Sequence, residues 1–262
     1  MSDKPSCRIE LLVLDGDDTL WESAVYFQRA ENDFLRLMEA LGHPASEVRP
    51  RIHRMDLLRL SSTGYGAVPY MQTLREVMTE HNDPPSWALR AMDSIERNLL
   101  EHPVILLPSV LSVLKGLHRI GVNFIVYTMG EFEHQHSKFQ RSGLTDLVSE
   151  CHIPPRKTED ELRSLLMHHE ASSSRTVLVG NSPKSDINPA LAVGVNAVHL
   201  QRPGTWAAEM EDYIHPDRVH RISGFDELPG VLHALELIDS SAYGEGSGGF
   251  LSSRGREVGE TR

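Results

Sequence analysis

The chain of 262 residues has few cysteines, little positive charge and no long apolar run. Its two cysteines, Cys7 and Cys151, are too few for a disulfide framework. The formal net charge of -11 argues against a protein that coats nucleic acid, because neutralising phosphates requires a basic surface. No apolar run is long enough to span a membrane, and residues 1–10 do not resemble a signal peptide. We therefore expect a cytoplasmic protein whose partner is neither nucleic acid nor membrane.

The most informative segment lies close to the N-terminus, where an apolar run ends in a group of carboxylates. Residues 11–14 are four consecutive aliphatic side chains, a pattern typical of a strand covered on both faces in a parallel sheet. Asp15 and Asp17 follow, and ligand sites in such sheets lie beyond the carboxyl ends of the strands. Two carboxylates facing one small volume repel each other, and a divalent cation such as Mg²⁺ is the simplest remedy. An Asp-rich turn or a helix N-cap is the alternative for this segment alone.

A second predicted strand ends in a hydroxyl side chain. Apolar positions in residues 110–120 recur at helical spacing and lead into an apolar run at residues 122–127. Thr128, Met129 and Gly130 follow this run. A hydroxyl and backbone N–H groups at a strand-to-helix turn can bind a phosphoryl oxygen without adding charge. A threonine at the end of a strand is weak evidence by itself, because threonine favours strands.

A single basic residue is expected to balance the charge of such a site. Lys157 precedes the helical stretch 161–169, and its ammonium could bridge a carboxylate and a phosphate. Arg156 carries the same charge and could fill this role instead. Lys157 could also be a solvated loop lysine without a role in the site.

A third buried strand is predicted at residues 176–180, and polar side chains follow it. Asn181 comes first and Asp186 five residues later. An Asn oxygen can ligate Mg²⁺ but supplies no charge, so we expect weaker metal binding than at a site made only of carboxylates. Asp186 is therefore the safer ligand.

Residues 22–106 show helical periodicity without alternation, which predicts a bundle of about four helices. The four arginines in this segment are interpreted mainly as a solvated helix face, and the turn at residues 61–66 as an interhelical loop, although either could contact substrate. The arginines are Arg49, Arg51, Arg54 and Arg59.

The histidines at positions 134, 136, 168 and 169 lack a convincing set of further ligands and are expected at the surface.

The four polar segments, in this order, resemble the haloacid dehalogenase-like superfamily, whose first motif is Asp-x-Asp-x-Thr. The match is the run from Asp15 to Thr19. The resemblance implies that Asp15 attacks phosphorus to form an aspartyl-phosphate, while Asp17 protonates the leaving oxygen and later deprotonates water. Members commonly have Gly where this chain has Asp18, which we expect to be a local cap. The family also expects Asp where this chain has Asn181.

The resemblance implies a doubly wound parallel α/β sheet with a Rossmann-like core and an inserted helical cap. We assign residues 1–21 and 107–238 to the core, 22–106 to the cap and 239–262 to a disordered tail. The expected cofactor is Mg²⁺. The expected sites are catalytic Asp15, Asp17, Thr128 and Lys157, substrate-binding Thr128, Met129, Gly130 and Lys157, and metal-binding Asp15, Asp17, Asn181 and Asp186.

The predicted function is a Mg²⁺-dependent hydrolase that removes phosphate from a small phosphorylated metabolite. A haloacid dehalogenase would use Asp15 to displace halide but needs neither a metal nor an acid at position 17. A non-catalytic protein that binds a phosphate ligand has no need to keep Asp15, Asp17, Thr128 and Lys157 together. A phosphomutase passes the phosphoryl group to another hydroxyl, and no residue decides between it and a phosphatase. The sequence sets no expectation for the oligomeric state.

Overall fold

The computed structural model describes residues 7–64, 66–80 and 83–239. Six parallel strands form one sheet in the order β3-β2-β1-β4-β5-β6. The strands are β1 (Leu11–Leu14), β2 (Phe124–Tyr127), β3 (Glu150–His152), β4 (Thr176–Gly180), β5 (Asn196–Leu200) and β6 (Val219–Ile222). The predicted tail from residue 240 onward and Tyr65 of the predicted turn lie outside the described residues.

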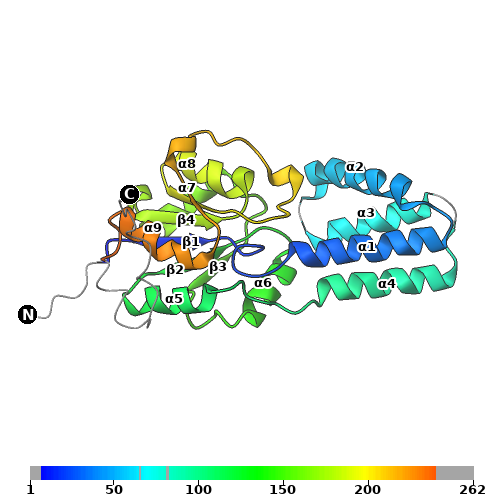
Figure 1. The fold of residues 1–262 in the computed structure, drawn as a ribbon, viewed down its shortest axis with the longest axis horizontal. Coiled ribbons are helices and arrows are strands. Elements are labelled where there is room, and N and C mark those ends of the chain that lie inside the picture. The colour runs from blue at the N-terminus through cyan, green and yellow to red at the C-terminus, as the bar shows by residue number, and fades with distance from the viewer. Residues whose placement is uncertain (1–6, 65, 81–82, 240–262) are drawn as a thin grey trace, which may run out of the picture.

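Helices cover both faces of this sheet. Leu12 and Leu14 of β1 belong to an apolar cluster with α5 (Val110–Arg119), α6 (Phe132–Arg141) and α9 (Leu228–Ala234). Leu11 and Val13 point to the other face, where they cluster with α7 (Glu159–His168) and α8 (Asn188–Val193). Figure 1 shows these two helical layers on either side of the strands. The consecutive aliphatic residues of β1 are explained by this double cover.

Four helices lie beyond one end of the sheet (Figure 1) and have an apolar cluster of their own. They are α1 (Ala24–Ala40), α2 (Ala45–Thr63), α3 (Ala67–Thr79) and α4 (Ser86–Leu100). The two segments that connect them to the sheet run side by side, since Glu22 N donates to Ile105 O at 2.9 Å and Leu107 N donates to Leu20 O at 2.9 Å.

The predicted fold class, a doubly wound parallel sheet with an inserted helical bundle, is confirmed. The limits of the two domains, residues 1–21 with 107–238 and residues 22–106, stay a prediction. Within the described part of the chain, no helix combines the length and apolar character needed to cross a membrane.

Candidate active site

The polar residues expected at the strand ends gather around one cavity of about 670 Å³. The chain proceeds from β1 to β2 and β3 in one direction and places β4, β5 and β6 on the other side, so the strand order reverses at β1. Open α/β sheets bind ligands at such a reversal. Of the predicted site residues, all line this cavity except Gly130: Asp15, Asp17, Thr128, Met129, Lys157, Asn181 and Asp186.

Lys157 joins two buried carboxylates. Its Nζ donates to Asp15 Oδ1 at 2.5 Å and to Asp186 Oδ1 at 2.7 Å. The three side chains are 2%, 8% and 1% exposed, respectively, so water screens their charges little. Burial and the charge of Asp186 raise the pKa of Asp15 to about 7, although the Lys157 ammonium opposes this rise. Arg156, the competing basic residue, is exposed instead.

The position of Asp186 depends on a glycine at the end of β4. A Cβ atom at Gly180 would lie 2.3 Å from Asp186 Cγ, closer than any real contact allows. Ser182 N donates to Asp186 Oδ2 at 3.0 Å and holds the second carboxylate oxygen. Residue 180 therefore lacks a side chain because the Asp186 carboxylate occupies that space.

The oxygen atoms around Asp15 suit a hard cation. Asp15 Oδ2 is buried without a hydrogen-bond partner among the described residues. Asn181, which lines the same cavity, accepts a long hydrogen bond of 3.5 Å at Oδ1 from Thr19 Oγ1. Carboxylate and amide oxygens are the ligands that Mg²⁺ prefers, and a buried oxygen without a partner is costly. Asp15, Asn181 and Asp186 thus fit the predicted metal.

Asp17 lies in a different environment from the one predicted. Both its oxygens accept hydrogen bonds from Lys138 Nζ, at 2.6 and 2.7 Å, and Trp21 Nε1 and Gln135 Nε2 donate to it at 2.6 and 3.0 Å. Burial alone would raise the pKa of Asp17, but the Lys138 ammonium and these hydrogen bonds lower it well below its usual range. Both oxygens of Asp17 are thus engaged, as are those of Asp186, which accept from Lys157 Nζ and Ser182 N. Metal binding by the Asp17 and Asp186 side chains stays a prediction.

Lys138 and Gln135 are the site residues that sequence reasoning missed. They lie three positions apart on α6 and therefore share a face. Gln135 Nε2 also donates to Met129 O at 3.0 Å, and a Cβ atom at Gly130, where φ is +138°, would crowd Gln135 Nε2 at 3.0 Å. Gly130 therefore leaves the space that the Gln135 side chain occupies. Two polar residues at helical spacing directly after the Thr128 motif are the signal that could have revealed them.

His134 is not the surface residue expected from the sequence. It lines the cavity, and its Nε2 is buried without a hydrogen-bond partner among the described residues. Burial and the nearby Lys138 charge lower the pKa of His134 to about 4, so the ring is neutral at physiological pH. His134 therefore offers an uncharged polar atom to a ligand.

The helical bundle supplies the wall opposite the strand ends. Phe27, Tyr70 and Trp206, the last from the loop after β5, give this wall aromatic surface. Glu31 and Asp56 add carboxylates. The Glu31 carboxylate accepts hydrogen bonds from Arg49 Nε at 2.9 Å and Tyr70 OH at 3.3 Å. None of the four bundle arginines lines the cavity. Arg49, Arg51 and Arg54 are exposed, as expected, whereas the Arg59 side chain is only 17% exposed and donates to Thr73 and Gln72 of α3.

No family model matches this chain, and no curated protein matches it. Solved structures do. A haloacid dehalogenase-like family hydrolase from Xanthomonas campestris is 27% identical, with a TM-score of 0.73 over 90% of this chain and 99% of that chain. A 2-haloacid dehalogenase from Pseudomonas syringae pv. Tomato is 22% identical, with a TM-score of 0.58 over 86% and 99%. A predicted phosphoglycolate phosphatase from Haemophilus somnus is 18% identical, with a TM-score of 0.58 over 86% and 98%.

Proposed function

Because the chain has the fold of the haloacid dehalogenase-like hydrolases, as its four motifs predict, we propose that it hydrolyses a small phosphomonoester with Mg²⁺ through an aspartyl-phosphate on Asp15. The observation that carries this proposal is the buried Lys157 between Asp15 and Asp186, with Asp15 Oδ2 left without a hydrogen-bond partner among the residues that the structure describes. A nucleophile beside a fixed positive charge is what attack on a phosphate requires. Proteins of this fold include dehalogenases, and the polar partners of Asp17 and the carboxylate of Asp186 favour the phosphatase.

In the first step, an Asp15 oxygen attacks phosphorus and the bond from phosphorus to the ester oxygen breaks. Lys157 stabilises the negative charge, and the Thr128 hydroxyl is placed at the cavity to donate to a phosphoryl oxygen. The leaving oxygen takes a proton from the Asp17 carboxyl, which pairs with Lys138.

In the second step, water gives a proton back to Asp17 while its oxygen attacks phosphorus. The bond from phosphorus to Asp15 then breaks and releases phosphate. Asp15, Asn181 and Asp186 would hold Mg²⁺, which when bound offsets the negative charge of the phosphoryl oxygens.

The bundle wall limits the class of leaving group. Glu31 is paired with Arg49, so the negative charge of this wall rests on Asp56, which disfavours a substrate with a further carboxylate or phosphate. The aromatic rings and this carboxylate together suit an uncharged or cationic organic group. The two lysines among the described lining residues are already paired with aspartates.

The test is phosphate release by the purified protein from a panel of small phosphomonoesters, with Mg²⁺ and with a chelator. We expect metal-dependent release that falls by about 10⁴-fold or more in Asp15→Asn, because the nucleophile is lost. Asp160→Asn, whose side chain is 97% exposed, is the matched control and should keep full activity. Undiminished activity in folded Asp15→Asn would refute the nucleophile assignment, and halide release from 2-haloacids without phosphate release would support the dehalogenase.

A further inference from the structure

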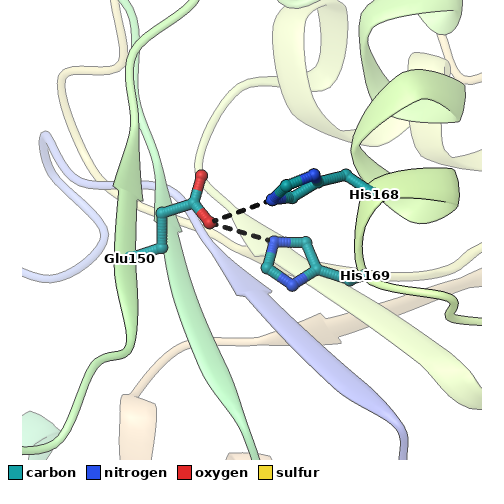
Figure 2. A group of neighbouring side chains, drawn as sticks. All are labelled: Glu150, His168 and His169. Carbon is teal, nitrogen blue, oxygen red and sulfur yellow. Dashed lines mark ion pairs between the residues drawn. The ribbon is translucent and has the colours of Figure 1, made fainter.

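A second group of metal-ligating side chains lies away from the cavity. Glu150 begins β3, which is an edge strand, His168 ends α7, and His169 follows it. Figure 2 shows the three side chains converging from the strand and the helix end. One ligand atom from each lies within 4.8 Å of the others, and none of the three residues lines the cavity. No further ligand for the two histidines was evident from the sequence. The fold brings Glu150, which is 18 positions before His168, next to them.

The separations between these atoms match ligands of one ion. His169 Nε2 lies 3.3 Å and His168 Nε2 lies 3.9 Å from the same carboxylate oxygen, Glu150 Oε2, along the dashed lines of Figure 2. Tetrahedral ligands at about 2.0–2.1 Å from a metal lie roughly 3.4 Å apart. The three atoms therefore need only small side-chain adjustments to share an ion.

An independent observation concerns the ring of His169. Its Nε2 is buried yet makes no hydrogen bond with the described residues, although a carboxylate oxygen lies 3.3 Å away. The distance is close enough for an ion pair, but the alignment is not that of a hydrogen bond. A buried nitrogen without a partner is costly, and a metal ion would satisfy it.

The second oxygen of Glu150 has support of its own. Glu150 Oε1 lies 3.7 Å from His152 Nδ1, and His152 Nε2 lies 3.0 Å from Glu161 Oε1. The His152 ring also stacks on Tyr127, with ring centroids 5.8 Å apart. Such outer partners fix the orientation of ligating carboxylates in metal sites.

We propose that Glu150, His168 and His169 bind a divalent transition metal of the zinc type. Two imidazoles and one carboxylate suit Zn²⁺, whereas Mg²⁺ prefers oxygen ligands only, so this site is chemically distinct from the one at Asp15. The ion joins the start of β3 to the end of α7 and thereby closes the segment that carries Lys157. The site is independent of the proposed phosphatase activity.

Zinc binding to the untagged full-length protein is measured by competition with a chromophoric chelator, in excess Mg²⁺ to occupy the hard-oxygen site. We expect one Zn²⁺ per chain that Asp15→Asn retains and the double variant His168→Ala/His169→Ala loses. His152→Ala, which removes an outer partner, should weaken binding by about 10-fold. Zinc should also raise the unfolding temperature of the wild type but not of the double variant.

The control is His215→Ala/His233→Ala, which removes two exposed histidines elsewhere and should bind zinc as the wild type does. The proposal is overturned if the wild type binds no zinc, or if the His168→Ala/His169→Ala protein binds it equally well. In either case the histidines serve only as ion-pair partners of Glu150. Because zinc binding is read without turnover, its failure is separate from a failure of the phosphatase proposal.

Discussion

At the scale of single residues, the charges of Asp17 and Lys138 depend on each other. The Lys138 side chain is 1% exposed and that of Asp17 28% exposed, so this carboxylate is the ion-pair partner of a buried lysine. Removal of one member of a buried ion pair leaves the other without compensation, which costs more than the pair itself contributes.

Lys138→Met should therefore lower the free energy of unfolding by about 3 kcal/mol at pH 7. The pKa of Asp17 in the folded protein is below its ordinary value of 3.8, so its contribution is present above about pH 4 and is lost as the pH falls toward the folded value. Urea unfolding at several pH values should show the gap between wild type and variant shrinking below pH 4.

The double variant Lys138→Met/Asp17→Asn is the control for this prediction, because it removes both charges and should recover much of the lost stability. A gap that does not change with pH would mean that Lys138→Met acts through packing and not through the charge of Asp17.

Asn181 is the residue at which this chain differs most clearly from the metal-site pattern that it resembles. Asn181 lines the cavity, and its amide oxygen carries no charge. Asn181→Asp should tighten Mg²⁺ binding by about 10-fold, because a carboxylate is a stronger ligand for a hard cation than an amide. Isothermal titration with Mg²⁺ measures this, with Asn98→Asp, at an exposed asparagine of α4, as the control. An unchanged titration for Asn181→Asp would place residue 181 away from the metal.

At the scale of elements, Asp18 connects the strand end to the bundle. Its carboxylate accepts hydrogen bonds from Ser23 N at 3.0 Å and from Ala24 N at 2.9 Å, which are backbone donors at the start of α1. Asp18 has φ of +59°, a conformation that Asp and Asn tolerate better than most residues. Asp18 therefore caps the N-terminus of α1, as expected, although it lies outside that helix.

Asp18→Ala should lower the free energy of unfolding by about 1–2 kcal/mol, because it removes the cap and keeps the left-handed backbone. Asp18→Asn retains an acceptor oxygen and should lose less than half as much. Thermal unfolding followed by circular dichroism compares the two. Equal losses would show that the cap hydrogen bonds contribute nothing and that another property of Asp18 matters.

Elements were predictable where one local pattern decides them. The buried strands β1, β2 and β4 were visible as largely apolar runs, because both faces of each are covered. The edge strand β3, Glu150–His152, was not, since it is short and half-buried and carries polar side chains. The same limitation hid the convergence of Glu150 with His168 and His169, which depends on how β3 and α7 meet in space.

At the scale of the whole molecule, the resemblance of four motifs identified the fold, but the far wall of the cavity could not be predicted. Asp15 and Asp17 are informative because they follow directly on a recognisable strand. Glu31 and Asp56 come from two helices whose periodicity reports burial and not which residues face the sheet. Their approach to the cavity depends on the packing of the bundle against the strand ends, and no local signal encodes it.

The charge of that wall predicts substrate preference. Aminoethyl phosphate and phosphoglycolate are similar in size, but one carries an ammonium and the other a carboxylate. We expect kcat/KM to favour the amine by at least about 10-fold, because like charges placed together are costly in an enclosed site.

The preference should depend on Asp56. Burial raises the pKa of Asp56 to about 6, despite the opposing charges of His53 and Arg59. Asp56 therefore gains its charge as the pH rises from 5 to 7, and the ratio of kcat/KM for the amine over the carboxylate should rise over that interval in the wild type. Asp56→Asn should flatten this rise and reduce the ratio. The control is Asp160→Asn, at an exposed aspartate that does not line the cavity, and it should change neither the ratio nor its pH dependence. A ratio below one in the wild type, or a ratio that depends on pH equally in the wild type and in Asp56→Asn, would show that the bundle wall does not select the leaving group by charge.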